Sequence, residues 1–129
     1  EWQEFWIESA GATLSYLNVE KISNETHSLY ATDYLKYKTS VFISHKIAGK
    51  LSARWDLSFQ KREGTWLNNT GNEVKYKPFT LADVRLVWRE RMFTISLEAT
   101  NLFNTKYLHL ANLPQPGRWF KAGISVSIL

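Results

Sequence analysis

The sequence of 129 residues contains no cysteine, and this absence excludes both a disulfide framework and a thiolate metal site. It also has no stretch near the roughly 18 consecutive apolar residues that a membrane-spanning helix requires. No segment shows convincing 3.6-residue periodicity, so we predict no helix. The first residues lack the basic start and apolar run of a secretory leader, and we expect no signal peptide within this chain.

Residues that could carry catalysis or bind a metal are few and dispersed. His27, His45 and His109 fall on separate predicted elements, and their spacing does not indicate a metal site. No serine lies in a nucleophile elbow, and no glycine-rich loop could hold a phosphate. We therefore predict a protein that is not an enzyme and that requires neither a metal nor another cofactor.

What the sequence does contain is long, regular alternation of apolar and polar residues. Between Leu51 and Gln60 every second side chain is apolar, and the stretches Phe93–Thr100 and Phe120–Ile128 repeat this pattern. Successive side chains of a strand point to opposite faces, so each stretch has one apolar and one polar face. The predicted fold is all-β, an antiparallel up-and-down meander of six long strands: 8–19, 33–47, 51–63, 79–88, 92–101 and a final strand that runs to Leu129.

Alternation of this kind is typical of soluble antiparallel sheets as well as of membrane barrels. The predicted strands are about 10 to 14 residues long, whereas soluble strands most often have about 5–6. The connections 48–50 and 89–91 are short, and the connections 20–32, 64–76 and 102–117 are long and polar. Outer-membrane barrels have short turns on one side and long loops on the other, so these two features favour a transmembrane barrel.

Two motifs near the end of the chain point to a family. Asn101-Leu102-Phe103-Asn104-Thr105-Lys106-Tyr107 follows one predicted strand, and Gln115-Pro116-Gly117-Arg118-Trp119-Phe120 opens the last one. The pair resembles the C-terminal end of TonB-dependent outer-membrane receptors, which carry N-L-F-(N/D)-x-x-Y and then P-G-R-x-(F/W). The chain departs from that family at its end, because Leu129 stands where the receptors usually have an aromatic residue.

The resemblance implies a fold, a place and a function. Residues 1–129 would form the C-terminal portion of a receptor barrel that closes with about twenty-two strands in the outer membrane of a Gram-negative bacterium. The plug domain, the earlier strands and the segment that contacts TonB are absent from this chain. Such receptors import a bulky chelate, namely a siderophore, haem or cobalamin. The sequences Tyr76–Phe79 and Gln115–Trp119 are most similar to cobalamin-type receptors.

The resemblance also implies partners and sites. Expected partners are outer-membrane lipid, the chelate, TonB through the absent parts, and the rest of the receptor or other copies through the open strand edges. No nucleic acid is expected. Loops on a rigid scaffold usually carry specificity, so we expect ligand contacts in the long loops, from Trp66, Asn68, Asn69, Tyr107, His109 and Asn112.

The polar faces would line the lumen of the barrel. Charged residues there are expected at similar depths, with opposite charges side by side on neighbouring strands: Arg54, Asp56, Asp83, Arg85, Glu98 and Lys121. One alternative function stays open, a soluble β-barrel module that binds single-stranded nucleic acid. The formal net charge of +4 and the many aromatic residues would suit that alternative, but the basic residues form no single stripe.

Overall fold

The computed structural model describes residues 6–18, 34–108 and 113–128. These residues form an antiparallel six-stranded sheet in the order β1-β2-β3-β6-β7-β8, and a two-stranded sheet, β4-β5. The large sheet consists of β1 (Ile7–Tyr16), β2 (Tyr34–Ala48), β3 (Leu51–Glu63), β6 (Phe79–Arg89), β7 (Phe93–Thr100) and β8 (Trp119–Val126). The predicted all-β class and the meander of six strands are therefore confirmed. Nowhere in the described ranges is there a helix of the length and apolarity needed to cross a membrane.

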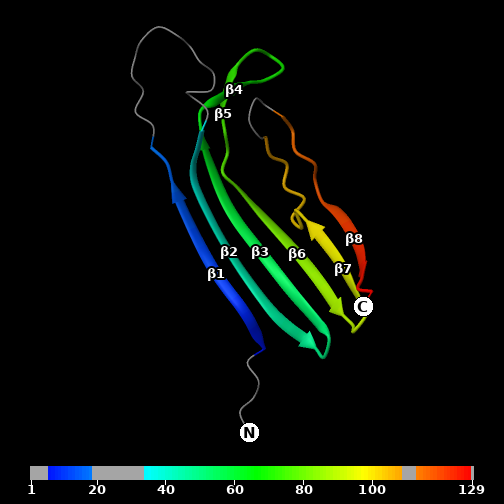
Figure 1. Ribbon diagram of the computed structural model, residues 1–129. Helices are drawn as coiled ribbons and strands as arrows, with labels where there is room; N and C mark the ends of the chain where they lie inside the picture. The colour runs from blue at the N-terminus through cyan, green and yellow to red at the C-terminus, as the bar shows by residue number, and fades with distance from the viewer. Residues whose placement is uncertain (1–5, 19–33, 109–112, 129) are drawn as a thin grey trace.

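Among the described residues, the two tight turns lie at one end of the sheet and the β4-β5 hairpin lies at the other (Figure 1). Gly49 and Lys50 turn β2 into β3, and residues 90–92 turn β6 into β7. Gly49 has a φ of 50°, which glycine adopts without steric cost. An ion pair between Lys50 and Glu90 links the two turns, and the hydrogen bond from Lys50 holds the pKa of the Glu90 carboxyl below its ordinary value. The predicted alternation of connection lengths is confirmed for these turns.

Two details of the predicted elements are wrong. The stretch 64–76, predicted as a loop, contains the hairpin β4 (Thr65–Leu67) and β5 (Glu73–Lys75). Its tip is closed by Asn68, whose Oδ1 accepts the backbone N–H groups of Thr70 and Asn72 at 3.0 and 2.9 Å. The last strand was predicted to run to the chain end. Strand β8 ends at Val126, and Leu129 lies outside the described residues.

The apolar residues of neighbouring strands lie on one and the same face of the sheet. The register places Ala53 opposite Leu86, Leu86 opposite Leu97, and Leu97 opposite Ala122. A second row, farther from the tight turns, is aligned in the same way and consists of Ile43, Trp55, Val84, Ala99 and Phe120. Because every strand contributes in phase, the apolar face is continuous across the sheet. We call it the apolar face below.

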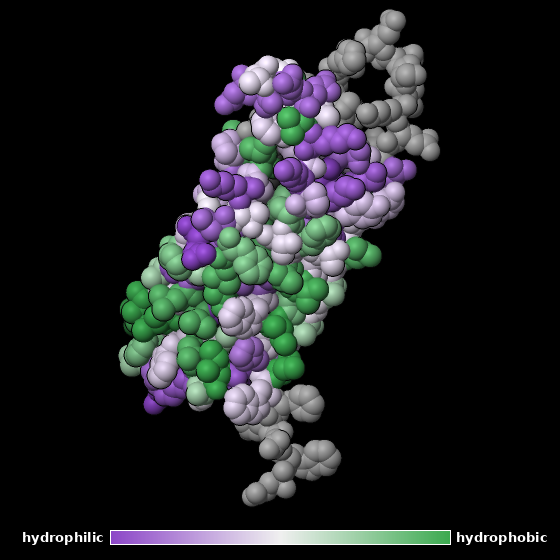
Figure 2. Space-filling view, turned by 180° about the vertical axis from the view of Figure 1, so that it is seen from behind, coloured by the Kyte–Doolittle hydropathy of each residue, from purple (hydrophilic) through white to green (hydrophobic). Residues whose placement is uncertain are grey.

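This apolar face has no covering layer among the described residues. In that part of the chain the buried hydrophobic residues are Ala53 and Ala82 alone. Large side chains of the same face are open, with Trp55 45%, Ile95 39% and Ile124 71% exposed. Figure 2 shows apolar side chains gathered in a band over the lower part of the molecule, below a polar end. An exposed apolar surface of this extent is unfavourable in water and marks a surface that contacts something apolar.

The sheet is open at both sides. Strand β1 pairs with β2 alone and β8 pairs with β7 alone within the described residues, so each has one free edge. Free edges expose backbone donors and acceptors that pair readily with another strand. Closure of the sheet into a barrel is therefore not part of the observed fold.

Two residues of β2 interrupt the alternation, and each has a partner that accounts for it. His45 lies on the apolar face, where its Nε2 accepts the indole N–H of Trp55 at 3.1 Å. Phe42 lies on the polar face beneath the guanidinium of Arg54, whose Cζ is 4.1 Å from the ring centroid. Gly11 is opposite Phe42, and a Cβ there would be 2.5 Å from the ring, so a residue without a side chain is required.

Candidate functional site

The segment after β7 is fixed to the sheet by Asn101. This residue is 5% exposed and has a φ of 52°, a conformation that asparagine tolerates better than most residues. Its backbone N–H donates to Asp83 Oδ1 at 2.8 Å. Its side chain accepts the N–H of Thr105 at 2.8 Å and donates to the Thr105 carbonyl at 2.9 Å. Asn101 therefore closes a turn and ties it to β6.

Asn104 joins the two sequence motifs to each other. It has a φ of 51°, and its N–H donates to the carbonyl of Asn101 at 2.8 Å. Its Oδ1 accepts the backbone N–H of Arg118 at 3.0 Å, at the start of the last strand. Both asparagine side chains thus hydrogen-bond backbone groups of other residues. We call the contacts of Asn101 and Asn104 with Asp83, Thr105 and Arg118 the asparagine clasp.

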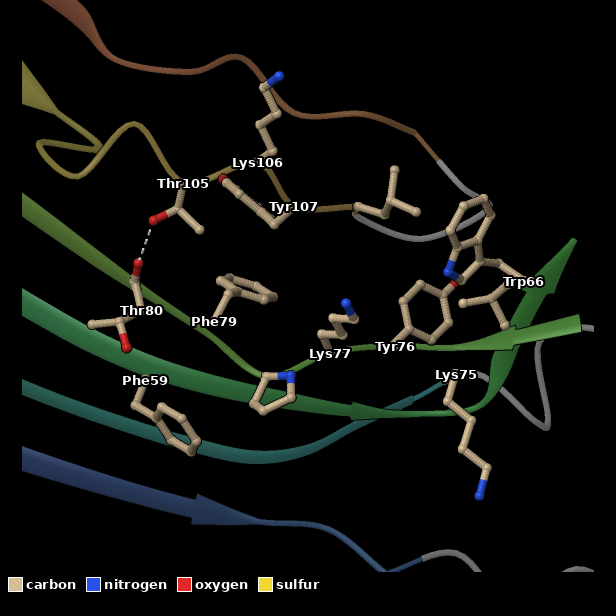
Figure 3. A pocket seen from close by; sticks show the side chains of 13 residues that line it. Phe59, Trp66, Lys75, Tyr76, Lys77, Phe79, Thr80, Thr105, Lys106 and Tyr107 are labelled. Atoms are coloured by element: carbon tan, nitrogen blue, oxygen red, sulfur yellow. Dashed lines mark hydrogen bonds between the residues drawn. The ribbon is translucent and has the colours of Figure 1, made fainter. Parts of the chain in front are cut away.

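The chain that leaves the asparagine clasp forms one wall of a groove of about 630 Å³. Thr105 Oγ1 donates to the carbonyl of Thr80 at 3.0 Å, which fixes this wall to the start of β6 (Figure 3). The other wall is the base of the β4-β5 hairpin and the residues that follow it. The described residues that line it are Phe59, Trp66, Val74, Lys75, Tyr76, Lys77, Pro78, Phe79, Thr80, Thr105, Lys106, Tyr107 and Leu108.

Half-buried aromatic rings form the body of this groove. Phe79 and Tyr107 stack with their centroids 4.5 Å apart and 22° between the planes. Burial raises the pKa of the Tyr107 hydroxyl, and the nearby Asp83 carboxylate raises it further, so the phenol stays protonated at neutral pH. Tyr76 is backed by Arg62, whose Cζ is 5.8 Å from the ring centroid. Tyr76 and Trp66 point toward each other at the hairpin side (Figure 3).

The charged residues that line the groove, among those described, are all lysines. Its described lining contains Lys75, Lys77 and Lys106 but no aspartate or glutamate. The three lysines are exposed, whereas the rings between them are half-buried. Figure 3 shows the Lys77 ammonium between the rings of Tyr76 and Phe79. The groove thus combines a ring-lined floor with a cationic rim.

Only part of the predicted ligand set meets in this groove. Trp66 and Tyr107, which are 41 positions apart in sequence, both line it. Asn68 and Asn69 lie at the hairpin tip outside the lining, and Asn68 uses its side chain to close its own turn. His109 and Asn112 lie outside the described residues. The predicted ligand set did not include the other residues of the groove lining, among them Lys75, Tyr76, Lys77, Phe79 and Lys106.

The predicted arrangement of charges on the polar face is partly wrong. The register places Arg54 directly opposite Arg85, and Asp56 directly opposite Asp83, so like charges face each other between β3 and β6. Along β3 the arginine precedes the aspartate, and along β6 the aspartate precedes the arginine. Because the two strands are antiparallel, like charges come to lie opposite each other. Arg54 instead pairs with Asp56 two positions along its own strand, with contacts of 2.9 and 3.0 Å.

Between β6, β7 and β8, opposite charges do lie side by side as predicted. Glu98 is flanked by Arg85 on β6 and by Lys121 on β8. Lys121 Nζ and Glu98 Oε1 are 3.2 Å apart. All six charged residues lie on the polar face, and Asp83 is the one that also supports the asparagine clasp.

Comparison with known proteins adds no relative. No protein family, no curated protein and no solved structure matches this chain. Within the described residues, no group of three or more histidine, aspartate or glutamate side chains is placed to hold a metal ion. The features that indicate function are therefore the two faces of the sheet and the groove.

Proposed function

We propose that this chain forms part of the barrel wall of an outer-membrane active-transport receptor of the TonB-dependent type. Such a receptor imports a bulky chelate and catalyses no reaction. The observation that carries the proposal is the single-layer sheet with one continuous, uncovered apolar face and one polar face. Lipid hydrocarbon is the natural partner of the apolar face, and a water-filled or plugged lumen is the natural partner of the polar face.

The dimensions of the apolar face support this proposal. On β3 the apolar positions run from Leu51 to Phe59, which is nine residues. A tilted strand needs about 9–11 residues to cross a bilayer. Tyr16 and Tyr37, whose ring centroids are 5.0 Å apart, lie toward the loop end, and Trp88 lies toward the turn end. Aromatic residues at both borders of the apolar band are typical of outer-membrane barrels.

The asparagine clasp gives the sequence resemblance a physical basis. In the receptors the same two motifs stand at the same end of the chain, and here they are in direct contact through Asn104 and Arg118. The groove lies beside this clasp at the loop end, where an imported compound would first bind. The alternative of a soluble nucleic-acid module would require a covered apolar face, and no described residue covers it.

The test uses the absence of cysteine, because a single introduced cysteine can be spin-labelled without background. The labels are placed one at a time at Thr94, Ile95, Ser96 and Leu97 of the full chain in liposomes. We expect labels at Ile95 and Leu97 to be accessible to oxygen, which concentrates in lipid. Labels at Thr94 and Ser96 should instead be accessible to a water-soluble nickel complex. Equal accessibility at all four positions, or immobile labels at Ile95 and Leu97, would refute the lipid-facing assignment.

A further inference from the structure

The described lining of the groove carries three lysines and no carboxylate; described carboxylates lie outside it, with Asp83 near Tyr107 and Glu63 near Lys75. Lys77 and Lys106 both line it, and neither has an ion-pair or hydrogen-bond partner in the part of the chain that the structure describes. Elsewhere on the sheet, lysines such as Lys36 and Lys121 are paired with Glu63 and Glu98. Among the described residues, nothing occupies the ammonium groups of these two lysines, and each could bind an external anion.

The rings beside these lysines favour a flat ligand. Phe79 and Tyr107 are already stacked at 4.5 Å, so their outer faces offer platforms for a further ring. Aromatic stacking tolerates many ring systems, whereas a cation on a flexible stem selects for negative charge. The volume of about 630 Å³ lies within the range of roughly 300–1,000 Å³ that small organic ligands occupy.

We infer that this groove binds a planar organic anion, a conjugated ring that carries a phosphate, sulfonate or carboxylate group. The ring lies against Phe79 and Tyr107, and the anionic group contacts Lys77 and Lys106. The inference rests on the proposed function only for its biological meaning: if the chain is a receptor wall, the planar anion is the class of compound that its loop end binds. It does not depend on which chelate is imported.

The test compares two probes that share one ring system. Flavin mononucleotide carries a phosphate, and riboflavin has the same isoalloxazine ring without it. Each is titrated into the full chain in zwitterionic detergent, and binding is followed by quenching of flavin fluorescence. The variants are Lys77→Gln and Lys106→Gln, and Lys46→Gln on the opposite end of the sheet is the matched control.

We expect flavin mononucleotide to bind at least about tenfold more tightly than riboflavin at low salt, and this difference to shrink as salt screens the lysines. Each groove variant should weaken binding of flavin mononucleotide by about three- to fivefold, and the Lys46 control should leave it unchanged. Equal affinity for the two flavins, or equal binding by the groove variants and the unaltered chain, would overturn the inference. The flavin comparison needs no variant, so misfolding cannot obscure it. Spin-label accessibility is measured separately, so failure of the anion site leaves the lipid-facing assignment standing.

Discussion

Gly117 packs against the side chain of Asn104 so closely that a Cβ at Gly117 would lie 2.3 Å from Asn104 Oδ1. The same oxygen accepts the N–H of Arg118 at 3.0 Å. A glycine at this position is therefore needed for close approach, because any side chain would push the asparagine away from the start of β8. Two motifs that are separated in sequence thus form one contact.

Gly117→Ala should destabilise the fold by about 1–3 kcal/mol, the usual cost of forcing an extra carbon into a packed contact. Asn104→Ala alone should cost about 1–2 kcal/mol, through loss of its hydrogen bond and because alanine is strained at its φ of 51°. In the Asn104→Ala background, Gly117→Ala should cost much less, because the clashing oxygen is gone. Urea unfolding in detergent micelles, followed by tryptophan fluorescence, measures the stability of the unaltered chain, of the two single variants and of the double variant. Simple additivity would show that the two residues are not coupled.

Asn101 should be more sensitive to substitution than Asn104, because it is buried and its side chain makes two hydrogen bonds with the backbone of Thr105. Asn101→Ala is expected to cost about 2–4 kcal/mol, since it leaves buried backbone groups unpaired and places alanine at a positive φ. Asn101→Gly loses the same side-chain bonds but adopts this φ freely, so it should cost about 1 kcal/mol less. The same unfolding assay gives both values, and equal costs would show that the backbone conformation contributes nothing.

The sequence predicted the strands well because their alternation is strong and local. The boundaries of β3 were predicted without error, and those of β2 and β6 within one residue, since a strand with one apolar and one polar face has a clear period. The hairpin β4-β5 was missed because Thr65–Leu67 and Glu73–Lys75 are each too short to show any period. Short strands depend on the turn between them, here the side chain of Asn68, rather than on a pattern.

Only two aromatic members of the candidate site were predicted from the sequence. Trp66 and Tyr107 stand out in polar loops, so composition alone selected them. Lys77 and Lys106 did not stand out, because lysines are common in loops and their lack of partners depends on tertiary geometry. The pairing of Arg54 with Asp56, rather than with β6, also required the register, which fixes which charges face each other.

The ion pair between the two tight turns gives a pH prediction. The pKa of Glu90 lies below its ordinary value of 4.5, mainly because Lys50 donates a hydrogen bond to it. A carboxyl with a depressed folded-state pKa stabilises the fold above its unfolded pKa, and this contribution is lost as the pH falls through the folded pKa. Carbon-13 NMR titration should show Glu90 titrating below 4.5, and Lys50→Met should raise its pKa. Lys46→Met is the control and should leave the Glu90 titration unchanged.

Because one face of the sheet is assigned to lipid and the other to the lumen, arginine substitutions at two adjacent residues in the middle of β3 should have different effects on stability. Leu57 is 48% exposed and belongs to the apolar face, whereas Ser58 belongs to the polar face. In liposomes, Leu57→Arg should destabilise the fold by about 2–4 kcal/mol, because the guanidinium would enter hydrocarbon, and Ser58→Arg should change stability little. Urea unfolding of the liposome-bound chain measures both. If the apolar face met water instead, an arginine at the exposed Leu57 would be tolerated, and this result would exclude a lipid-facing sheet.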